Sequence, residues 1–294
     1  MPIAAELIRK AAEQERKSWR RFTVHQEERL WNILDNGMKR LSATILAHTQ
    51  EGKIPPERLI LLRKEIAAEM ALLRPALTGQ IQRGMSQSVN MGVTAGVSQT
   101  KAAGLIVSDV LPAAVWSRIN NEALDALIRY SPTGTTLSER VWDLSWSAEK
   151  DIRNEVANSV LLGESADKLS RRIRNYLEIP ETFRGDVLST YKSGQGVYRS
   201  AYKNAMRLAR TEMNRAFSEG TIRYGLELNW IDGWIWRTGG LSPCEICEPN
   251  DGQFFPKDEP PSIPAHSNCL CFLELHFRDE TVTPETPANP EEGE

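Results

Sequence analysis

A small residue recurs at every fourth position near the middle of the chain. The members of this small-residue strip are Gly84, Ser88, Gly92, Gly96, Thr100 and Gly104. On a helix, positions four apart lie on one face, so the strip predicts a helical surface with very little side-chain volume. A second helix can approach such a surface closely. We expect close packing between two helices of one chain, and a contact between subunits is the alternative.

Apolar side chains at spacings of three and four continue on both sides of the strip, which is typical of amphipathic helices. The predicted helices cover residues 3–50, 57–73, 81–104 and 197–228, and two further helices contain the apolar stripes at residues 141–160 and 169–177. Gly163 is expected to end one helix, and Ser165 to cap the next. After residue 228 the pattern changes, because Trp234 and Trp236 would share one face of a strand. The predicted fold class is α+β, with helical N-terminal and central regions and a small C-terminal module that contains β-strands.

The predicted domains follow this change of pattern. Residues 1–135 form a helical N-terminal arm, and residues 136–278 form a second domain. The second domain is helical over residues 136–228, and residues 229–278 are the β-containing C-terminal module. The final segment, residues 279–294, has six acids and no Lys or Arg, and its low apolar content predicts a disordered acidic tail.

The charge balance argues against a dedicated nucleic-acid binder. Removing the acidic tail leaves 36 basic and 33 acidic residues, which is only a small basic excess. The N-terminus shows no apolar signal region, and no run approaches the roughly 18 apolar residues of a spanning helix. We therefore expect a protein of the cytosol, or of the particle into which it is assembled, with no membrane partner.

All four cysteines lie in one stretch, CEICEPNDGQFFPKDEPPSIPAHSNCLC, residues 244–271. Two residues separate Cys244 from Cys247, and the same gap separates His266 from Cys269, with Cys271 two positions further on. Because Zn²⁺ takes four ligands from Cys and His, five candidates compete for four places. Two ligand sets remain open. In one, Cys269 or Cys271 completes a site with the first three residues; in the other, the four cysteines bind and His266 lies outside.

A module of about fifty residues buries only a small apolar core and usually needs a disulfide or a metal ion. The absence of a secretory signal favours metal over disulfides, since cytosolic thiols stay reduced. A site rich in thiolates leaves no position for a reactive water. We therefore predict one structural zinc ion per chain and no enzymatic activity.

Glu212 falls on the apolar stripe of the predicted 197–228 helix. A carboxylate on a packed face needs a partner, which could be Arg215, Arg237 or a backbone amide. Glu212, Arg210 and Arg215 are predicted to form a structural anchor. A catalytic acid is the alternative, but no second carboxylate, Ser–His pair or group of histidines accompanies Glu212.

From about Leu137 to Phe277, roughly half of the chain, the order of motifs resembles the phage Mu F-like head morphogenesis family, also called minor head proteins. The motifs are GESADKLSRRI, ARTEMNRAFSEG, a Trp-containing strand, Cys-x-x-Cys, NDGQ and PAHSNCLC. Ser267 and Leu270 stand where the family usually has Pro and Arg. This departure affects contacts of the missing Arg and leaves the thiol and imidazole ligands in place.

The resemblance implies a structural minor head protein of a tailed bacteriophage, which acts in head assembly. The implied partners are the portal protein, the major capsid protein or scaffold and, weakly, packaged DNA. The implied location is the head interior or portal vertex of the virion, and the host cytoplasm during assembly. One alternative is a phage-head ADP-ribosyltransferase-like effector, although only the acidic tail follows Phe277 here. The other is a DNA-binding zinc module, although Lys257 is the only Lys or Arg between Thr238 and Phe277.

Overall fold

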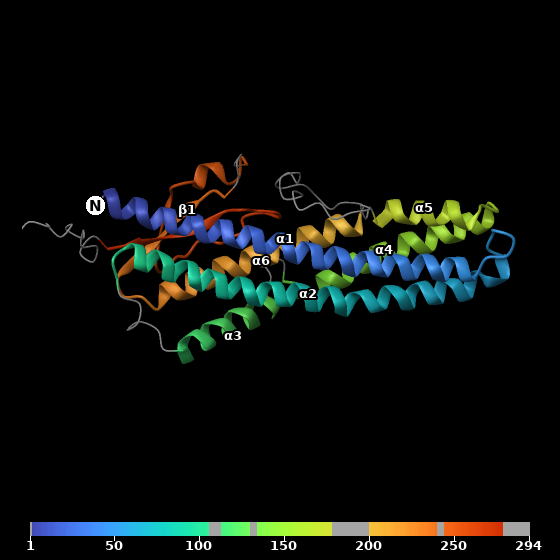
Figure 1. Cartoon of the computed structure of the whole chain (residues 1–294), viewed down its shortest axis with the longest axis horizontal. Helices are drawn as coiled ribbons and strands as arrows, with labels where there is room; N and C mark the ends of the chain where they lie inside the picture. Colours follow the sequence, from blue (N-terminus) through green and yellow to red (C-terminus); the bar gives the residue numbers. More distant parts are fainter. Residues whose placement is uncertain (1, 106–112, 130–133, 178–199, 240–243, 279–294) are drawn as a thin grey trace, which may run out of the picture. The chain divides into compact units, whose positions relative to one another are not determined.

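The structure is a computed structural model that describes residues 2–105, 113–129, 134–177, 200–239 and 244–278 (Figure 1). Its helices are α1 (Pro2–Ala47), α2 (Leu59–Ala102), α3 (Ala113–Arg129), α4 (Leu137–Leu161), α5 (Ala166–Leu177) and α6 (Ala201–Leu226), with short 3-10 helices η1 (Pro56–Arg58) and η3 (Glu248–Asn250). Its strands are β1 (Ile231–Arg237), β2 (Phe254–Pro256) and β3 (Phe272–Phe277). The predicted α+β class, mostly helical with a small C-terminal sheet, is confirmed. The predicted acidic tail lies outside the described residues.

The two longest helices are separated by a turn in which Glu51 and Gly52 have φ angles of 49° and 78°. The second of these helices, α2, is longer than expected, because it continues through Pro75. Proline removes one backbone donor, but Leu73 and Leu77 on either side of it are buried, so packing holds the helix together there. None of the helices in the described ranges combines the length and apolar composition needed to cross a lipid bilayer.

The chain divides into two compact units. Unit 1 contains Met1–Arg21, Ser86–Leu124 and Asn214–Glu294, and unit 2 contains Phe22–Met85 and Asp125–Met213. Helices α1, α2 and α6 each contribute residues to both units. These units therefore divide the chain differently from the boundary expected near residue 135, and that domain boundary stays a prediction.

Close packing of α2 against α6 in unit 1 explains the small-residue strip. A Cβ atom added to Gly92 would lie 1.9 Å from the carbonyl oxygen of Phe217, and one added to Gly220 would lie 2.2 Å from that of Val89. The hydroxyl of Thr221 also donates to the Gly92 carbonyl oxygen, at 3.0 Å. Only glycine permits backbones this close. The prediction of tight packing within one chain is confirmed.

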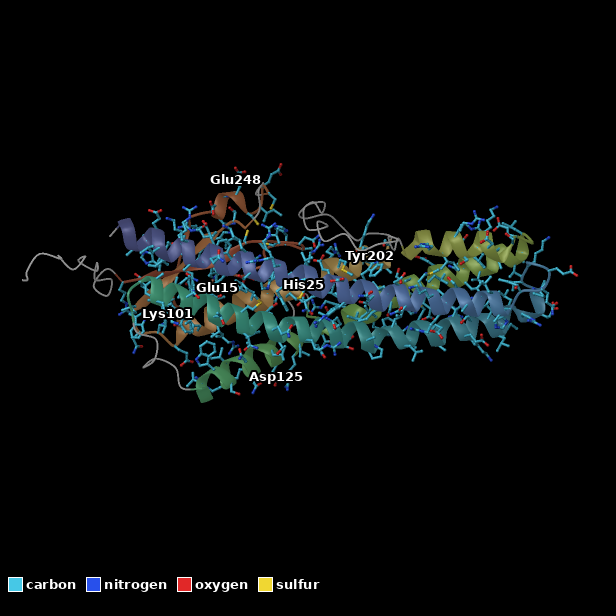
Figure 2. The ribbon with its side chains drawn as sticks, viewed as in Figure 1. Glu15, His25, Lys101, Asp125, Tyr202 and Glu248 are labelled. Atoms are coloured by element: carbon cyan, nitrogen blue, oxygen red, sulfur yellow. The ribbon has the colours of Figure 1, made fainter. Side chains whose placement is uncertain are left out.

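The first part of α1 also packs on α2 in unit 1. The indole Nε1 of Trp19 donates to the Ser88 hydroxyl at 3.1 Å. The Ser98 hydroxyl donates at 2.8 Å to Glu15, which is labelled in Figure 2. These contacts hold the side chains of residues 15–19 in place, and they fix the direction of Arg16 between them.

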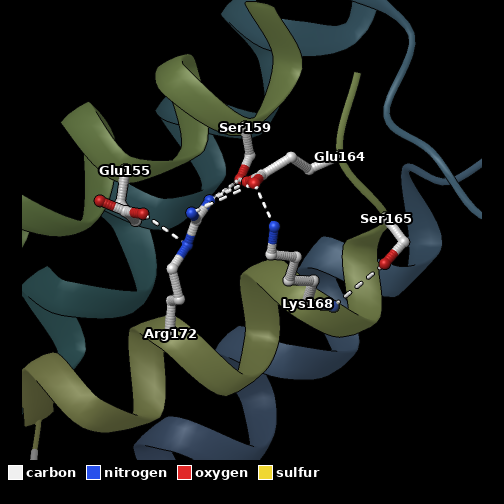
Figure 3. A network of polar contacts seen from close by, with 6 residues as sticks. All are labelled: Glu155, Ser159, Glu164, Ser165, Lys168 and Arg172. Carbon is white, nitrogen blue, oxygen red and sulfur yellow. Dashed lines mark hydrogen bonds and ion pairs between the residues drawn. The ribbon is translucent and has the colours of Figure 1, made fainter. Parts of the chain in front are cut away.

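Many polar contacts in the α4–α5 segment of unit 2 join residues close in sequence. Thr136 and Glu139 form a capping box at the start of α4. Gly163 ends the turn after α4 with a φ of 60°, and the Ser165 hydroxyl accepts from the Lys168 amide at 3.3 Å, as predicted for a cap. Figure 3 shows the network around the connection between the two helices, where Glu164 binds the Lys168 ammonium at 2.7 Å and also pairs with Arg172.

The C-terminal sheet is antiparallel, in the order β2-β1-β3. Trp234 and Trp236 of β1 face the core with Leu273 and Leu275 of β3, as the alternation predicts. The opposite face is buried too, since Glu274 is only 4% exposed and pairs with Arg237. The sheet is therefore covered on both faces where β1 and β3 meet.

Candidate metal centre

Five side chains of the C-terminal module converge beside the sheet. Cys244 and Cys247 lie in the turn that leads into η3. His266 and Cys269 lie at the two ends of a second turn, and Cys271 directly precedes β3. All four cysteines are free thiols in the structure.

The first turn brings two thiols to the same side of the chain. The amides of Cys247 and Glu248 both donate to the carbonyl oxygen of Cys244, each at 2.9 Å. Glu248, labelled in Figure 2, then begins η3. A gap of two residues closed by such bonds lets both sulfurs face one point.

The second turn repeats this geometry. The Cys269 amide donates to the His266 carbonyl oxygen at 3.2 Å. Asn268, between them, has a φ of 61°, a left-handed conformation that asparagine adopts more readily than most residues. The turn therefore depends on Asn268 as well as on the two donor residues that it places.

The donor atoms lie within coordination range of one another. The Nε2 atom of His266 is 3.1 Å from the Cys244 sulfur and 3.0 Å from the Cys247 sulfur. The Cys247 and Cys269 sulfurs are 3.8 Å apart. The donors form two groups that share Cys247, one with Cys244 and His266 and one with Cys269 and Cys271.

The imidazole of His266 is oriented for coordination through Nε2. Its Nδ1 lies 2.8 Å from the carbonyl oxygen of Ser267. A carbonyl oxygen only accepts, so Nδ1 carries the proton, and in the neutral ring Nε2 presents its lone pair to the cysteines. This arrangement of the two ring nitrogens is common among histidines that bind metals.

The centre is continuous with the apolar core of the module. Cys247, Cys269 and Cys271 are between 1% and 3% exposed and belong to the same core cluster as Trp234 and Trp236. The other two donors are half-buried. The arrangement encloses the donor atoms and does not leave them on an open surface.

Hydrogen bonds between the donors set their charges. The pKa of Cys269 is held far below its ordinary range, because the Cys247 and Cys271 thiols donate to it. The same contacts, together with burial, raise the pKa of Cys247 and of Cys271. The hydrogen bond to Cys269 also raises the pKa of His266 to about 9. Burial raises the pKa of Cys244, but hydrogen bonds from the following turn outweigh it and the net shift is downward.

Asn214 of α6 connects the helix to the second turn of the centre. Its Nδ2 donates to the carbonyl oxygens of Cys269 and Cys271, at 2.8 Å and 3.3 Å. Its Oδ1 accepts from Nη1 of Arg16 at 2.7 Å, and Asn214 itself is fully buried. The amide therefore fixes the backbone that presents two thiols and also fixes an arginine from α1.

Neither Arg16 nor Asn214 is among the residues predicted from sequence. Arg16 could have been noticed, because it interrupts an apolar line on α1 formed by Ile8, Ala12 and Trp19, all of which are buried. A charged residue at such a position needs a partner elsewhere. No comparable pattern surrounds Asn214, whose partners lie 198, 55 and 57 residues away.

The three predicted anchor residues all lie on α6. Arg210 and Glu212 belong to unit 2, and Arg215 belongs to unit 1. Glu212 is 1% exposed and forms an ion pair with Arg140 of α4. Arg210 is equally buried and binds Glu27, with Nη2 at 2.7 Å from Oε2. Arg215 is half-buried. Glu212 and Arg210 each pair with a residue of another helix, α4 and α1 respectively, so both contacts hold helices together.

Two details of these ion pairs differ from the sequence expectation. Arg140 was not among the expected partners of Glu212, because it lies 72 residues away on another helix. Arg237 was one of the expected partners of Glu212, but it forms an ion pair with Glu274, with Nε 2.6 Å from Oε2. Burial also raises the pKa of Glu27, although Arg210 opposes this shift.

The donor set fits a metal ion that binds sulfur and imidazole. A tetrahedral ion with bonds of about 2.3 Å to sulfur holds two sulfurs about 3.8 Å apart. This is the distance between Cys247 and Cys269, and it is far longer than the roughly 2.05 Å of a disulfide. The cluster can therefore bind a metal ion.

Comparisons with known proteins give no relative on which to base a function. None of the protein-family models matches the chain, and no curated protein or solved structure matches it significantly.

Proposed function

We propose that the C-terminal module binds one structural Zn²⁺ ion, and that the protein is a minor head protein of a tailed bacteriophage. The zinc part of the proposal is supported by the chemistry of the donors, which are thiols and an imidazole without a carboxylate. Hard ions such as Ca²⁺ and Mg²⁺ prefer oxygen ligands.

The ligand set that the distances favour contains three thiolates and one imidazole. Its members are Cys244, Cys247, His266 and Cys269. Cys269 is chosen over Cys271 because it contacts both Cys247 and the imidazole of His266. At Cys271 the hydrogen bond with Cys269 and burial raise the pKa, which favours the protonated thiol. On this assignment Cys271 is a buried thiol beside the site.

A structural role follows from the closed donor set. Four protein ligands fill a tetrahedral zinc ion, so no position remains for a water or a substrate. The ion would join two turns whose donors are about 20 residues apart, such as Cys247 and His266, which are 19 apart. Zinc therefore supplies a cross-link that the small core of the module would otherwise lack.

One observation supports the head-protein assignment beyond the motifs themselves. The helix motif ARTEMNRAFSEG and the closing motif PAHSNCLC contact each other directly, through the hydrogen bonds from Asn214 to Cys269 and Cys271. The motifs that carry the resemblance therefore belong to one packed site. Lys257, the one basic residue between Thr238 and Phe277, donates to the Leu228 carbonyl oxygen and is partly buried, which argues against its use as a phosphate contact.

The metal is tested first on the full-length chain purified without chelator. We expect about one zinc per chain by elemental analysis. Cys269→Ser should weaken zinc binding strongly, while Cys271→Ser should have a smaller effect. A chain without zinc, or the reverse order of the two variants, would contradict the site or the assignment respectively.

Assembly is tested by producing the chain together with the portal and major capsid proteins of the same phage. We expect it to purify with procapsids or with the portal. Absence from both assemblies, although the chain is intact and contains zinc, would exclude the head-protein role. Transfer of a labelled group from NAD to a target protein would instead support an ADP-ribosyltransferase.

A further inference from the structure

The first part of α1 places a cation inside the protein next to the proposed zinc centre. Arg16 is only 2% exposed, and its guanidinium lies 3.9 Å from the ring centre of Trp19. The rings of Phe217 and Phe272 lie nearby, at 5.4 Å and 6.0 Å. A cation among aromatic rings has lost most of its hydration, so it needs other favourable interactions.

Hydrogen bonding supplies only part of this compensation. Nη1 of Arg16 donates to Asn214, but Nε and Nη2 have no hydrogen-bond partner among the described residues. Within the same ranges, no Asp or Glu forms an ion pair with Arg16. By contrast, the buried Arg210 has the carboxylate of Glu27. Among the carboxylates that the structure describes, Arg16 therefore lacks the counter-charge that a buried arginine requires.

The negative charge that acts on Arg16 comes from the sulfurs of the cluster, Cys269 before Cys271. Burial lowers the pKa of Arg16 to about 9, and these sulfurs oppose the shift. Arg16 thus remains charged at neutral pH. Asn214 joins the two sides physically, since it binds the guanidinium through Oδ1 and the Cys269 carbonyl through Nδ2.

We propose that Arg16 is the counter-charge of the zinc–thiolate centre, and that zinc binding and the burial of this arginine stabilise each other. The proposal rests on the zinc site proposed above. A zinc ion with three thiolates and one neutral imidazole has a single net negative charge, and Arg16 has a single positive charge. Arg16 is a positioning residue, because it acts through Asn214 and the field of its charge and is not a ligand.

This pairing links two parts of the chain that lie far apart in sequence. Arg16 and Asn214 are 198 residues apart, and both belong to unit 1. When zinc leaves, the second turn that Asn214 joins to Arg16 loses its ion, and the buried arginine loses the centre that balances its charge. The first part of α1 should then pack less tightly on the module, so zinc controls how firmly this helix is held.

The test compares three variants of the full-length protein. Arg16→Met removes the charge and keeps an unbranched stem, Arg16→Lys keeps the charge, and Lys17→Met is a matched control at an exposed neighbour on the same helix. Zinc affinity is measured by competition with a chromophoric chelator. We expect about a 10- to 100-fold loss for Arg16→Met, as for other groups that support metal ligands. The zinc affinity of Arg16→Lys should be closer to that of the unsubstituted protein than to that of Arg16→Met. The zinc affinity of Lys17→Met should equal that of the unsubstituted protein.

Hydrogen exchange of peptides from residues 8–21 provides a second measurement that does not depend on metal affinity. Removing zinc from the unsubstituted protein should speed exchange in these peptides. In Arg16→Met the effect of zinc removal should be clearly smaller, because the charge that couples the two sites is gone.

Three results would overturn the inference. Equal zinc affinity for Arg16→Met and the unsubstituted protein would exclude the counter-charge. Equal weakening by Arg16→Met and Arg16→Lys would show that shape matters and charge does not. A chain that binds no zinc at all would overturn this inference together with the zinc site, whereas the first two results leave the zinc site standing.

Discussion

The α4–α5 segment and the C-terminal module are both held by polar contacts, but these contacts act over different distances along the chain. In α4–α5 the partners are close in sequence, as for Thr136 and Glu139, three residues apart, or Glu164 and Lys168, four apart. In the C-terminal module they are distant, as for Asn214 and Cys269, which are 55 residues apart. The connection between α4 and α5 is therefore held mainly by local contacts, although Arg140 and Glu149 of α4 also pair with Glu212 and Arg74 on other helices. The metal centre, by contrast, depends on a few contacts that must all form.

This difference has a consequence for stability. Local contacts at helix ends each contribute about 0.5–2 kcal/mol, and losing one leaves the rest in place. The donors of a metal centre act together, because an ion with one ligand missing is bound far less tightly and the turns it joined are released. Substitutions should therefore have graded effects in α4–α5 and large effects in the C-terminal module.

The largest effect is expected for Cys247→Ser, because Cys247 belongs to both groups of donors. Structural zinc contributes on the order of 10 kcal/mol to the folding of small zinc domains. The variant should lose its zinc, and the near-ultraviolet circular dichroism of Trp234 and Trp236 should collapse. Ile246→Ser is the matched control, since Ile246 lies in the same turn and is 52% exposed. A Cys247→Ser protein with full zinc content would contradict the expectation that single substitutions have larger effects in the C-terminal module than in α4–α5.

The next largest effect is expected for Asn214→Ala. The substitution leaves Nη1 of Arg16 and the carbonyl oxygen of Cys269 without their partner in a buried place. Leaving a buried polar group unpaired costs about 1–3 kcal/mol. Chemical denaturation should show this loss together with weaker zinc binding. Glu219→Gln on the same helix breaks only a partly buried i,i+4 pair with Arg223, and it should change stability by less than about 1 kcal/mol.

A smaller effect is expected for Thr136→Ala at the start of α4. The variant loses the hydroxyl that accepts from the Glu139 amide at 3.2 Å, and removing such a cap costs about 1 kcal/mol. Thermal unfolding should register this decrease while zinc content is unchanged. Ser138→Ala, at an exposed position in the same turn, should behave like the unsubstituted protein. A loss of zinc in Thr136→Ala would show that the two regions are not independent.

The smallest effect, and one that depends on pH, is expected for Glu164→Gln. Its hydrogen bond with Lys168, helped by Ser159 and Arg172 and opposed by burial, lowers the pKa of Glu164 from 4.5 to about 2. Because the pKa is lower in the folded protein, the stabilising contribution is complete above about pH 4.5 and is lost as the pH falls through about 2. The difference in thermal midpoint between the two proteins should therefore be present at neutral pH and disappear near pH 2. A difference that grows on acidification would show that the Glu164 contacts destabilise the connection.

The sequence predicted the local features of both regions well, for a physical reason. Helical periodicity, the glycine turn at Gly163, the cap at Ser165 and the two-residue gaps between donors all depend on neighbours within a few positions. The small-residue strip also predicted close helix packing, because a face without side-chain volume admits few other arrangements. The exception among the helices is Pro75, where burial on both sides outweighs the local preference for a break.

By itself, then, the sequence determined the α+β class, the packing face on α2 and the five candidate donors. The tertiary structure decided which distant residues support those donors. It paired Glu212 with Arg140, it placed Asn214 beneath the second turn, and it placed Arg16 next to the thiolates. Such pairings join positions 55 to 198 residues apart. No periodicity or turn chemistry encodes them, because they follow only from burying several helices against one small sheet.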